Sequence, residues 1–315
     1  MTTTLWEYPS QHYDPWNTDP ACVGWKGGAG GGGGAGARPG MQGDKGYVGA
    51  TPSWVIWQLL MRYTREGDVV VDPMCGSGTT LDVCRDTGRR GLGFDVSPRR
   101  EDIGGADARA LPLVDGAADF VFVDPPYSTH VAYSDEPGCI GRLDAGGADG
   151  GRAYYTAMEG VIAEASRVLK DRRYLGLYVS DSYRKGGAGR TGEMMPIGFE
   201  LFARLRRWFR PIDVVVVTRG NRKLERGNWH KTAADENFFL RGFNYLFIMK
   251  KEMGLKGGSA PRGDGPPGPG GGTRAGGGVK GDRTIGEKGG VKGGGKGGGA
   301  RRGLSGPSGP GSRRR

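Results

Sequence analysis

Two short segments of the 315-residue chain carry residue types that could bind a ligand and react with it. The first is the glycine-rich segment 72–80, DPMCGSGTT, which follows the apolar run 69–71. Gly76 and Gly78 allow a tight turn and a close approach of the backbone to a ligand, and the N-terminus of a following helix would point to the same place. By itself such a turn is weak evidence, because dinucleotide-binding enzymes and purely structural turns share it.

The second segment is Asp124-Pro125-Pro126-Tyr127, which follows the apolar run 120–123. Two consecutive prolines cannot continue a central strand, so they predict a rigid turn. This set of groups suits a flat heterocycle that bears an amino group. The ring of Tyr127 can stack on the heterocycle, while Asp124 and the carbonyl of Pro125 accept its two N–H bonds. An ordinary turn at the end of a strand is the alternative.

Further acids follow the neighbouring predicted strands. Asp95 ends the run 91–95, and Asp107, followed by Ala108, comes after a short element near Ile103. The carboxyl ends of parallel strands share one edge of the sheet, and open α/β folds bind ligands there. We therefore expect Asp95 to accept hydrogen bonds from ribose hydroxyls, although three unrelated surface acids could arise by accident.

The elements that must position these residues form one α/β domain. Apolar runs alternate with helical patterns between Thr51 and Lys251, which indicates a mainly parallel sheet. The predicted fold is a Rossmann-like, mainly parallel seven-stranded sheet with helices on both faces, its last two strands paired in antiparallel fashion. The sequence predicts helices from Pro52 to Gly67 and over 79–86, 154–169 and 199–209, and strands over 68–72, 91–95, near 103, and over 119–124, 174–180, 212–218 and 243–250.

Glycine-rich segments flank this domain. Residues 1–50 are expected to form an N-terminal segment with a loop insertion at 27–37, residues 51–252 the domain, and residues 253–315 a disordered tail. From Lys256 to Arg315, 13 Lys or Arg stand against three acids, so this stretch carries +10 of the chain's net charge of +11. A flexible polycation attracts nucleic acid without reading its sequence, and a merely solubilising tail is the equal alternative.

The cysteines and the remaining composition indicate the redox environment and the cellular location that we expect for the protein. Cys22, Cys75, Cys84 and Cys139 have neither the spacing of a zinc site nor the density of a disulfide scaffold, so no metal is predicted. The polar and aromatic start and the lack of a long apolar stretch predict no signal peptide and no membrane span. We expect a soluble cytoplasmic protein with reduced thiols.

At these segments the chain resembles the amino-methyltransferases, a DNA-methyltransferase class that modifies adenine N6 or cytosine N4. Segment 72–80 resembles the cofactor motif, 124–127 the catalytic motif, 51–54 (TPSW) the motif that closes over the methionine end of the cofactor, and 2–9 (TTTLWEYP) a segment near the start of some bacterial methylases. The resemblance implies S-adenosylmethionine as cofactor and DNA as partner. It implies these cofactor-binding residues: Thr51, Pro52, Trp54, Asp72, Pro73, Cys75, Gly76, Gly78, Thr79, Asp95, Asp107 and Ala108.

Two departures from the family pattern concern motif order and target recognition. The residues of the cofactor motif are those typical of the subgroup of the family in which the catalytic motif comes first in the chain. Here the cofactor motif instead precedes Asp124. No long target-recognition domain follows, and only 128–151, 184–193 and 219–237 are long enough to read bases. The last of these carries a basic and aromatic cluster suited to nucleic acid, or else exposed charges for solubility: Arg222, Lys223, Trp229, His230 and Lys231.

The expected reaction is direct, in-line methyl transfer to the amino nitrogen of a base flipped out of the duplex. Hydrogen bonds from the amine to Asp124 and Pro125 would localise its lone pair. An RNA methyltransferase acting on guanine N2 is the nearest rival. A non-catalytic nucleic-acid-binding protein with a relic fold and a nicotinamide oxidoreductase are further rivals. The sequence leaves open adenine or cytosine as target, the recognition site, the oligomeric state and a restriction endonuclease partner.

Overall fold

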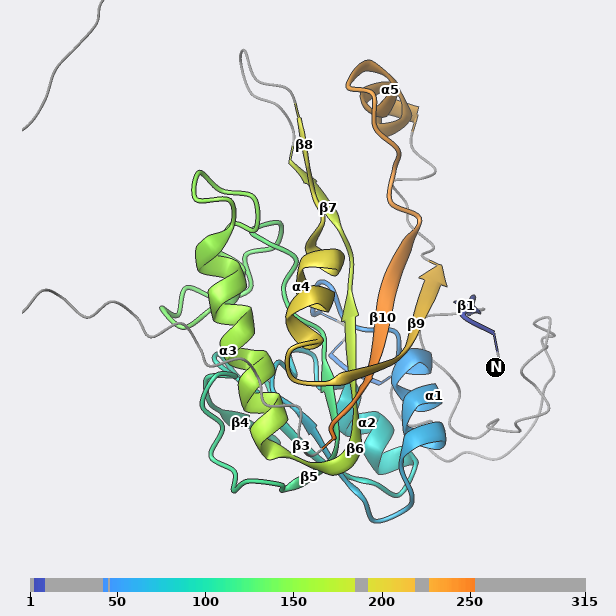
Figure 1. The fold of residues 1–315 in the computed structure, drawn as a ribbon, viewed down its shortest axis with the longest axis vertical. Helices are drawn as coiled ribbons and strands as arrows, with labels where there is room; N and C mark the ends of the chain where they lie inside the picture. Colours follow the sequence, from blue (N-terminus) through green and yellow to red (C-terminus); the bar gives the residue numbers. More distant parts are fainter. Residues whose placement is uncertain (1–2, 9–41, 45, 185–191, 219–226, 253–315) are drawn as a thin grey trace, which may run out of the picture. The chain divides into compact units, whose positions relative to one another are not determined.

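The computed structural model describes residues 3–8, 42–44, 46–184, 192–218 and 227–252 (Figure 1). The predicted glycine-rich insertion at 27–37, Cys22 and the predicted tail at 253–315 lie outside the described residues.

Eight strands form one sheet, which confirms the predicted α/β class with a mainly parallel sheet. Every neighbouring pair is parallel except those of β10, which runs antiparallel to both β6 and β9. In spatial order the strands are β1 (Leu5–Trp6), β9 (Arg210–Thr218), β10 (Phe243–Lys250), β6 (Leu169–Val179), β5 (Ala118–Val123), β2 (Val69–Asp72), β3 (Arg90–Asp95) and β4 (Ile103–Gly105).

All seven predicted strands are present, and β1 is an additional eighth. It pairs in parallel with β9, with Leu5 opposite Val216 and Trp6 opposite Val217. Trp6 is buried, and its indole N–H donates to the carbonyl of Thr3 at 2.8 Å. A two-residue strand carries too little periodicity to be recognised in the sequence. It becomes visible only through its pairing with β9 in the structure.

Helices cover both faces of the sheet, and the alternation of side chains along each strand explains why. In β5, Phe120 and Phe122 pack in the core cluster of α1 (Ser53–Tyr63) and α2 (Thr79–Asp86). Val121 and Val123 point to the other face and pack in the cluster of α3 (Arg152–Val168) and α4 (Ile197–Leu205). A strand buried on both faces reads as a continuous apolar run, as β5 does.

The first helix is shorter than predicted. It ends at Tyr63 rather than at Gly67, because Thr64 adopts an extended backbone and its hydroxyl donates to the carbonyl of Leu60 at 2.6 Å. Gly67, at φ +82°, instead makes the turn into β2.

Three further elements escape the sequence-based prediction. They are the antiparallel ribbon of β7 (Ser182–Arg184) and β8 (Glu193–Met195), the short 3-10 helix η2 (Ile140–Arg142), and α5 (Gly227–Asp235). Figure 1 shows the ribbon and α5 at the end of the sheet where β10 begins. None of the helices in the described parts of the chain combines the length and apolar character that a membrane span requires.

Candidate functional site

A cavity of about 920 Å³ lies at the edge of the sheet where the parallel strands end. Asp72 ends β2, Asp95 ends β3 and Asp124 follows β5, and all three line the cavity. Because β10 runs antiparallel, its first residues lie at this same edge, and Asn244 joins the wall. The topology therefore brings together residues that are far apart in sequence.

The glycine-rich turn between β2 and α2 is held by the two acids beside it. The carboxylate of Asp72 accepts hydrogen bonds from the Thr80 hydroxyl at 2.5 Å and the Met74 N–H at 3.0 Å. Asp95 accepts from the Gly76 N–H at 3.0 Å. Gly76 has a φ of +46°, and a Cβ there would lie 2.6 Å from the Tyr47 hydroxyl. The turn therefore requires glycine for its backbone and for the close approach of Tyr47.

Negative charge accumulates at the floor of the cavity. Burial raises the pKa of Asp72 to about 7; hydrogen bonds from Thr80 and Met74 oppose this shift, and the charges of Asp124 and Asp95 add to it. Burial likewise raises the pKa of the Cys75 thiol well above its ordinary value, so this cysteine remains protonated. A positively charged ligand would relieve the repulsion among the three carboxyl groups.

The Asp124–Tyr127 segment is fixed by hydrogen bonds from three other elements. The Tyr127 hydroxyl donates to Asp124 Oδ1 at 2.8 Å, and the Thr51 hydroxyl donates to Oδ2. The Asn244 amide donates to the Tyr127 hydroxyl at 3.3 Å. Tyr154, fully buried in α3, donates to the carbonyl of Pro126 at 2.8 Å. Asp124 is thus oriented before any ligand arrives.

Aromatic side chains form the remaining wall. Tyr47 and Tyr133 stack with ring centroids 5.9 Å apart, and the guanidinium of Arg99 lies 5.2 Å from the Tyr47 centroid. Tyr8, two residues after β1, stacks on Trp54 at 5.8 Å with an interplanar angle of 10°. Flat apolar surfaces of this kind suit the planar rings of a nucleoside or base.

Three cavity-lining side chains keep a buried polar atom without a hydrogen-bond partner among the described residues. These atoms are the Tyr8 hydroxyl, the Asn244 Oδ1 and the Arg241 Nε. Buried polar groups in native proteins are nearly always paired, so orphaned ones on a cavity wall fit a site that receives polar groups of a ligand.

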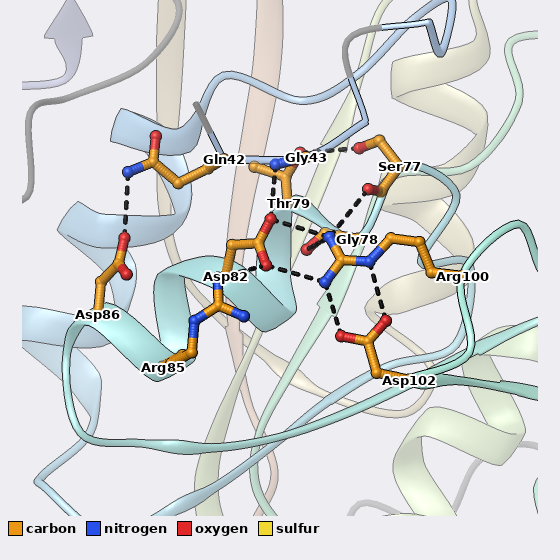
Figure 2. A network of polar contacts seen from close by, with 10 residues as sticks. All are labelled: Gln42, Gly43, Ser77, Gly78, Thr79, Asp82, Arg85, Asp86, Arg100 and Asp102. Carbon is orange, nitrogen blue, oxygen red and sulfur yellow. Dashed lines mark hydrogen bonds and ion pairs between the residues drawn. The ribbon is translucent and has the colours of Figure 1, made fainter. Parts of the chain in front are cut away.

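A polar network pins the chain before Thr51 onto the start of α2 (Figure 2). Asp82 accepts from the Gly43 N–H at 2.7 Å and from both terminal nitrogens of Arg100 at 2.9 Å. Arg100 also donates through Nε to Asp102 at 2.8 Å. Although burial acts to raise the pKa of Asp82, the bonds from Arg100 and Gly43 lower it more. This network holds the segment that carries Tyr47 and Thr51 over the cavity.

The structure brings most of the predicted site residues to one cavity. Those that line it are Thr51, Pro52, Asp72, Pro73, Cys75, Gly76, Thr79, Asp95, Asp124, Pro126, Tyr127 and Trp229. Arg222 and Lys223 lie outside the described residues.

Several predicted site residues do not line the cavity: Trp54, Gly78, Asp107, Ala108, Pro125, His230 and Lys231. Gly78 supports the turn at φ +79°, where a Cβ would lie 2.4 Å from Arg100. Asp107 forms an ion pair with Arg109 at 2.5 Å, and Lys231 forms one with Asp235 at 2.5 Å. Trp54 supports Tyr8 from behind.

The residues that sequence reasoning missed are Tyr8, Tyr47, Tyr133 and Asn244. Of these, Asn244 could have been found, since an antiparallel pairing of the last two strands places the start of β10 beside the end of β9. The part of the chain that the structure describes contains no group of three or more His, Cys, Asp or Glu residues that could hold a metal ion.

Comparisons with known proteins agree with the motifs. A model of the DNA methylase family matches residues 3–104, which span β1 to β4. The type II methyltransferase M.MjaII of Methanocaldococcus jannaschii is 38% identical over 52 residues, which cover 16% of this chain and 10% of that protein. The chain thus matches only about a tenth of the length of this curated relative.

Solved structures resemble this chain less closely than the sequence matches do. TTHA0409 of Thermus thermophilus, described as a DNA modification methylase and solved with S-adenosyl-L-methionine, is 18% identical with a TM-score of 0.33, over 47% of this chain and 54% of that chain. TrmN of Thermus thermophilus is 16% identical with a TM-score of 0.42, over 65% of this chain and 50% of that chain. The resemblance to the DNA methylase family rests on the sequence match over residues 3–104.

Proposed function

We propose that this chain is an S-adenosylmethionine-dependent methyltransferase that methylates an exocyclic amino nitrogen of a DNA base, adenine N6 or cytosine N4. The observation that carries the proposal is the single cavity that contains both the glycine-rich turn of the methylase family and the pre-oriented Asp124–Tyr127 segment. Its volume of about 920 Å³ is near the upper end for one small ligand, which suits a cofactor and a base together.

The cavity fits this cofactor by charge and shape. Asp95 and Asp124 line the cavity beside Asp72, and their charges add to the raised pKa of Asp72, so the cavity floor favours a cationic ligand. Asp95 holds the Gly76 and Ser97 N–H groups and keeps further acceptor capacity, with which we propose it binds the ribose hydroxyls. When bound, S-adenosylmethionine supplies a methyl group on a sulfonium, an electrophile that needs no further activation.

The residues of this chain would prepare the amine. An exocyclic amine is a poor nucleophile because its lone pair is delocalised into the ring. The Asp124 carboxylate accepts hydrogen bonds from the Tyr127 and Thr51 hydroxyls, which orient it, and in this proposal it also accepts an N–H of the amine. Pro126 lines the cavity, and its carbonyl accepts one bond from Tyr154 and has a second lone pair, so it replaces that of Pro125, which does not line the cavity, as the proposed second acceptor. These bonds would localise the lone pair, and the nitrogen can release its proton to Asp124 or to water once it carries the methyl group.

The target base must leave the duplex to reach Asp124. Asp124 shares the cavity with the aromatic wall, and Tyr127 would stack on the flipped base. We propose that Trp229 on the cavity wall, together with Arg222, Lys223, His230 and Lys231 of the same segment, contacts the nucleic acid. A restriction endonuclease partner is compatible with this activity.

The test is incubation with tritiated cofactor and, separately, unmethylated plasmid DNA and transfer RNA, followed by mass spectrometry of the nucleosides. We expect N6-methyladenine or N4-methylcytosine in the DNA, and no product with Asp124→Ala. Methylated guanine N2 in the RNA would establish the rival activity. Cofactor binding by calorimetry without methyl transfer to either nucleic acid would favour a relic fold.

A further inference from the structure

Phe239 is the most exposed large apolar side chain in the described residues, at 90% exposure, and it lies on the wall of the candidate site. It belongs to the short connection between α5 and β10, where Phe238, Leu240 and Arg241 also line the cavity. Single exposed apolar side chains are common on protein surfaces, so the position of Phe239 on the wall of the candidate site is the observation that points to a contact with the substrate.

The neighbours of Phe239 are anchored, so the ring is presented by a fixed backbone. The Phe238 N–H donates to the carbonyl of Ala233 at 2.9 Å, and the Phe238 ring stacks on Tyr183 with centroids 4.1 Å apart. Arg241 donates to the carbonyl of Phe239 at 2.8 Å. Asn237, at φ +55°, makes the left-handed turn that ends α5 and directs the chain outward.

The proposed function predicts what this ring meets. A base that leaves a duplex for the cavity leaves a gap in the stack within one nucleotide of the cavity entrance. Proteins fill or open such steps with apolar side chains, phenylalanine among them. We propose that Phe239 inserts into double-stranded DNA and takes the place of the target base in the stack, with Arg241 beside it near the flanking phosphates. This inference rests on the proposed function and adds the residue that fills the gap left by the flipped base.

The first test compares native and heat-denatured plasmid DNA as methyl acceptors in single-turnover reactions. Phe239→Ala should slow transfer to native DNA by about tenfold, as expected for loss of one stacking contact, and should leave transfer to denatured DNA within about twofold of wild type. Phe239→Trp keeps a ring and should retain most of the native-DNA rate. The matched control is Phe199→Ala, because Phe199 is also exposed, at 62%, but lies on α4 outside the cavity wall.

Equal rates of wild type and Phe239→Ala on native DNA would overturn the proposal. So would an equal loss on native and denatured DNA, since that outcome indicates a general role in binding or folding.

The second test does not depend on methyl transfer. Inserted side chains unwind DNA, so relaxation of plasmid by topoisomerase I in the presence of bound wild type should change its linking number. Phe239→Ala should abolish the change, and Phe199→Ala should preserve it. Unwinding without methyl transfer to any DNA would refute the proposed function and support the insertion. The insertion would be refuted if wild type and Phe239→Ala gave the same linking number when equal amounts of protein are bound to the plasmid. This conclusion would hold whether or not methyl groups are transferred.

Discussion

Substituting Asp72 by asparagine should change how the stability of the protein depends on pH. The side chain is buried at the end of β2, where it accepts hydrogen bonds from Thr80 and Met74. Asparagine has nearly the same volume and does not titrate. The comparison of Asp72→Asn with wild type therefore isolates the ionisation of one group.

The direction and the size of this pH dependence of the free energy of unfolding follow from the raised pKa of Asp72. Burial moves the pKa of Asp72 from 3.8 to about 7, so between these values the folded protein holds a proton that the unfolded chain has lost. The stability that this proton contributes is complete below about pH 4 and is lost as the pH rises through 7. One pH unit corresponds to about 1.4 kcal/mol, so the two units between pH 5 and the folded pKa correspond to a loss of about 3 kcal/mol.

The assay is urea unfolding followed by circular dichroism at pH 5, 6, 7 and 8. The free energy of unfolding of wild type, minus that of Asp72→Asn, should fall by about 3 kcal/mol from pH 5 to pH 8. Carboxyl groups with a lowered pKa, such as Asp82 and Glu164, are common to both proteins and lose their contribution only at lower pH. A difference that stays constant across this range would refute a buried, protonated Asp72.

Three further substitutions test the arrangement of the site. Tyr127→Phe keeps the ring but loses the hydroxyl between Asp124 and Asn244, so single-turnover methyl transfer should slow by about tenfold while cofactor affinity, measured by calorimetry, stays unchanged. Asn244→Ala should slow transfer similarly, and the double variant should lose less than the product of the two effects; independent losses would show that the two groups do not act together. Arg100→Ala leaves Asp82 buried without its main partner and should lower the free energy of unfolding by about 3 kcal/mol in urea titrations; a loss under about 0.5 kcal/mol would show that the clamp is not structural.

Sequence reasoning placed the acids at the strand ends on the cavity. Asp72, Asp95 and Asp124 each follow an apolar run, and parallel strands bring their carboxyl ends to one edge whatever the details of packing. Asp107 shows where this reasoning fails. It follows β4 as predicted, but Arg109, two residues later, binds it through both the backbone N–H and the guanidinium. Such local capture depends on turn geometry, which the strand pattern does not determine.

Other site residues depend on contacts that no local pattern encodes. Tyr47 reaches Gly76 because Asp82 holds the backbone of Gly43, 39 residues earlier in the chain. Phe239 lies on a connection whose course is set by the cap of α5, an element too short and polar to be predicted. The sequence therefore predicts the floor of the cavity better than its walls and rim.

The place of β10 in the sheet constrains how this protein can be made. Its partners on either side, β6 and β9, both precede it in the chain and are not hydrogen-bonded to each other in the sheet. Until residue 250 has been synthesised, a nascent chain therefore presents two unsatisfied strand edges with an apolar gap between them. Such edges pair readily with strands from other chains. The domain must therefore complete its sheet late, and any circular permutant that joins the ends of the domain elsewhere would shift the moment at which this gap closes.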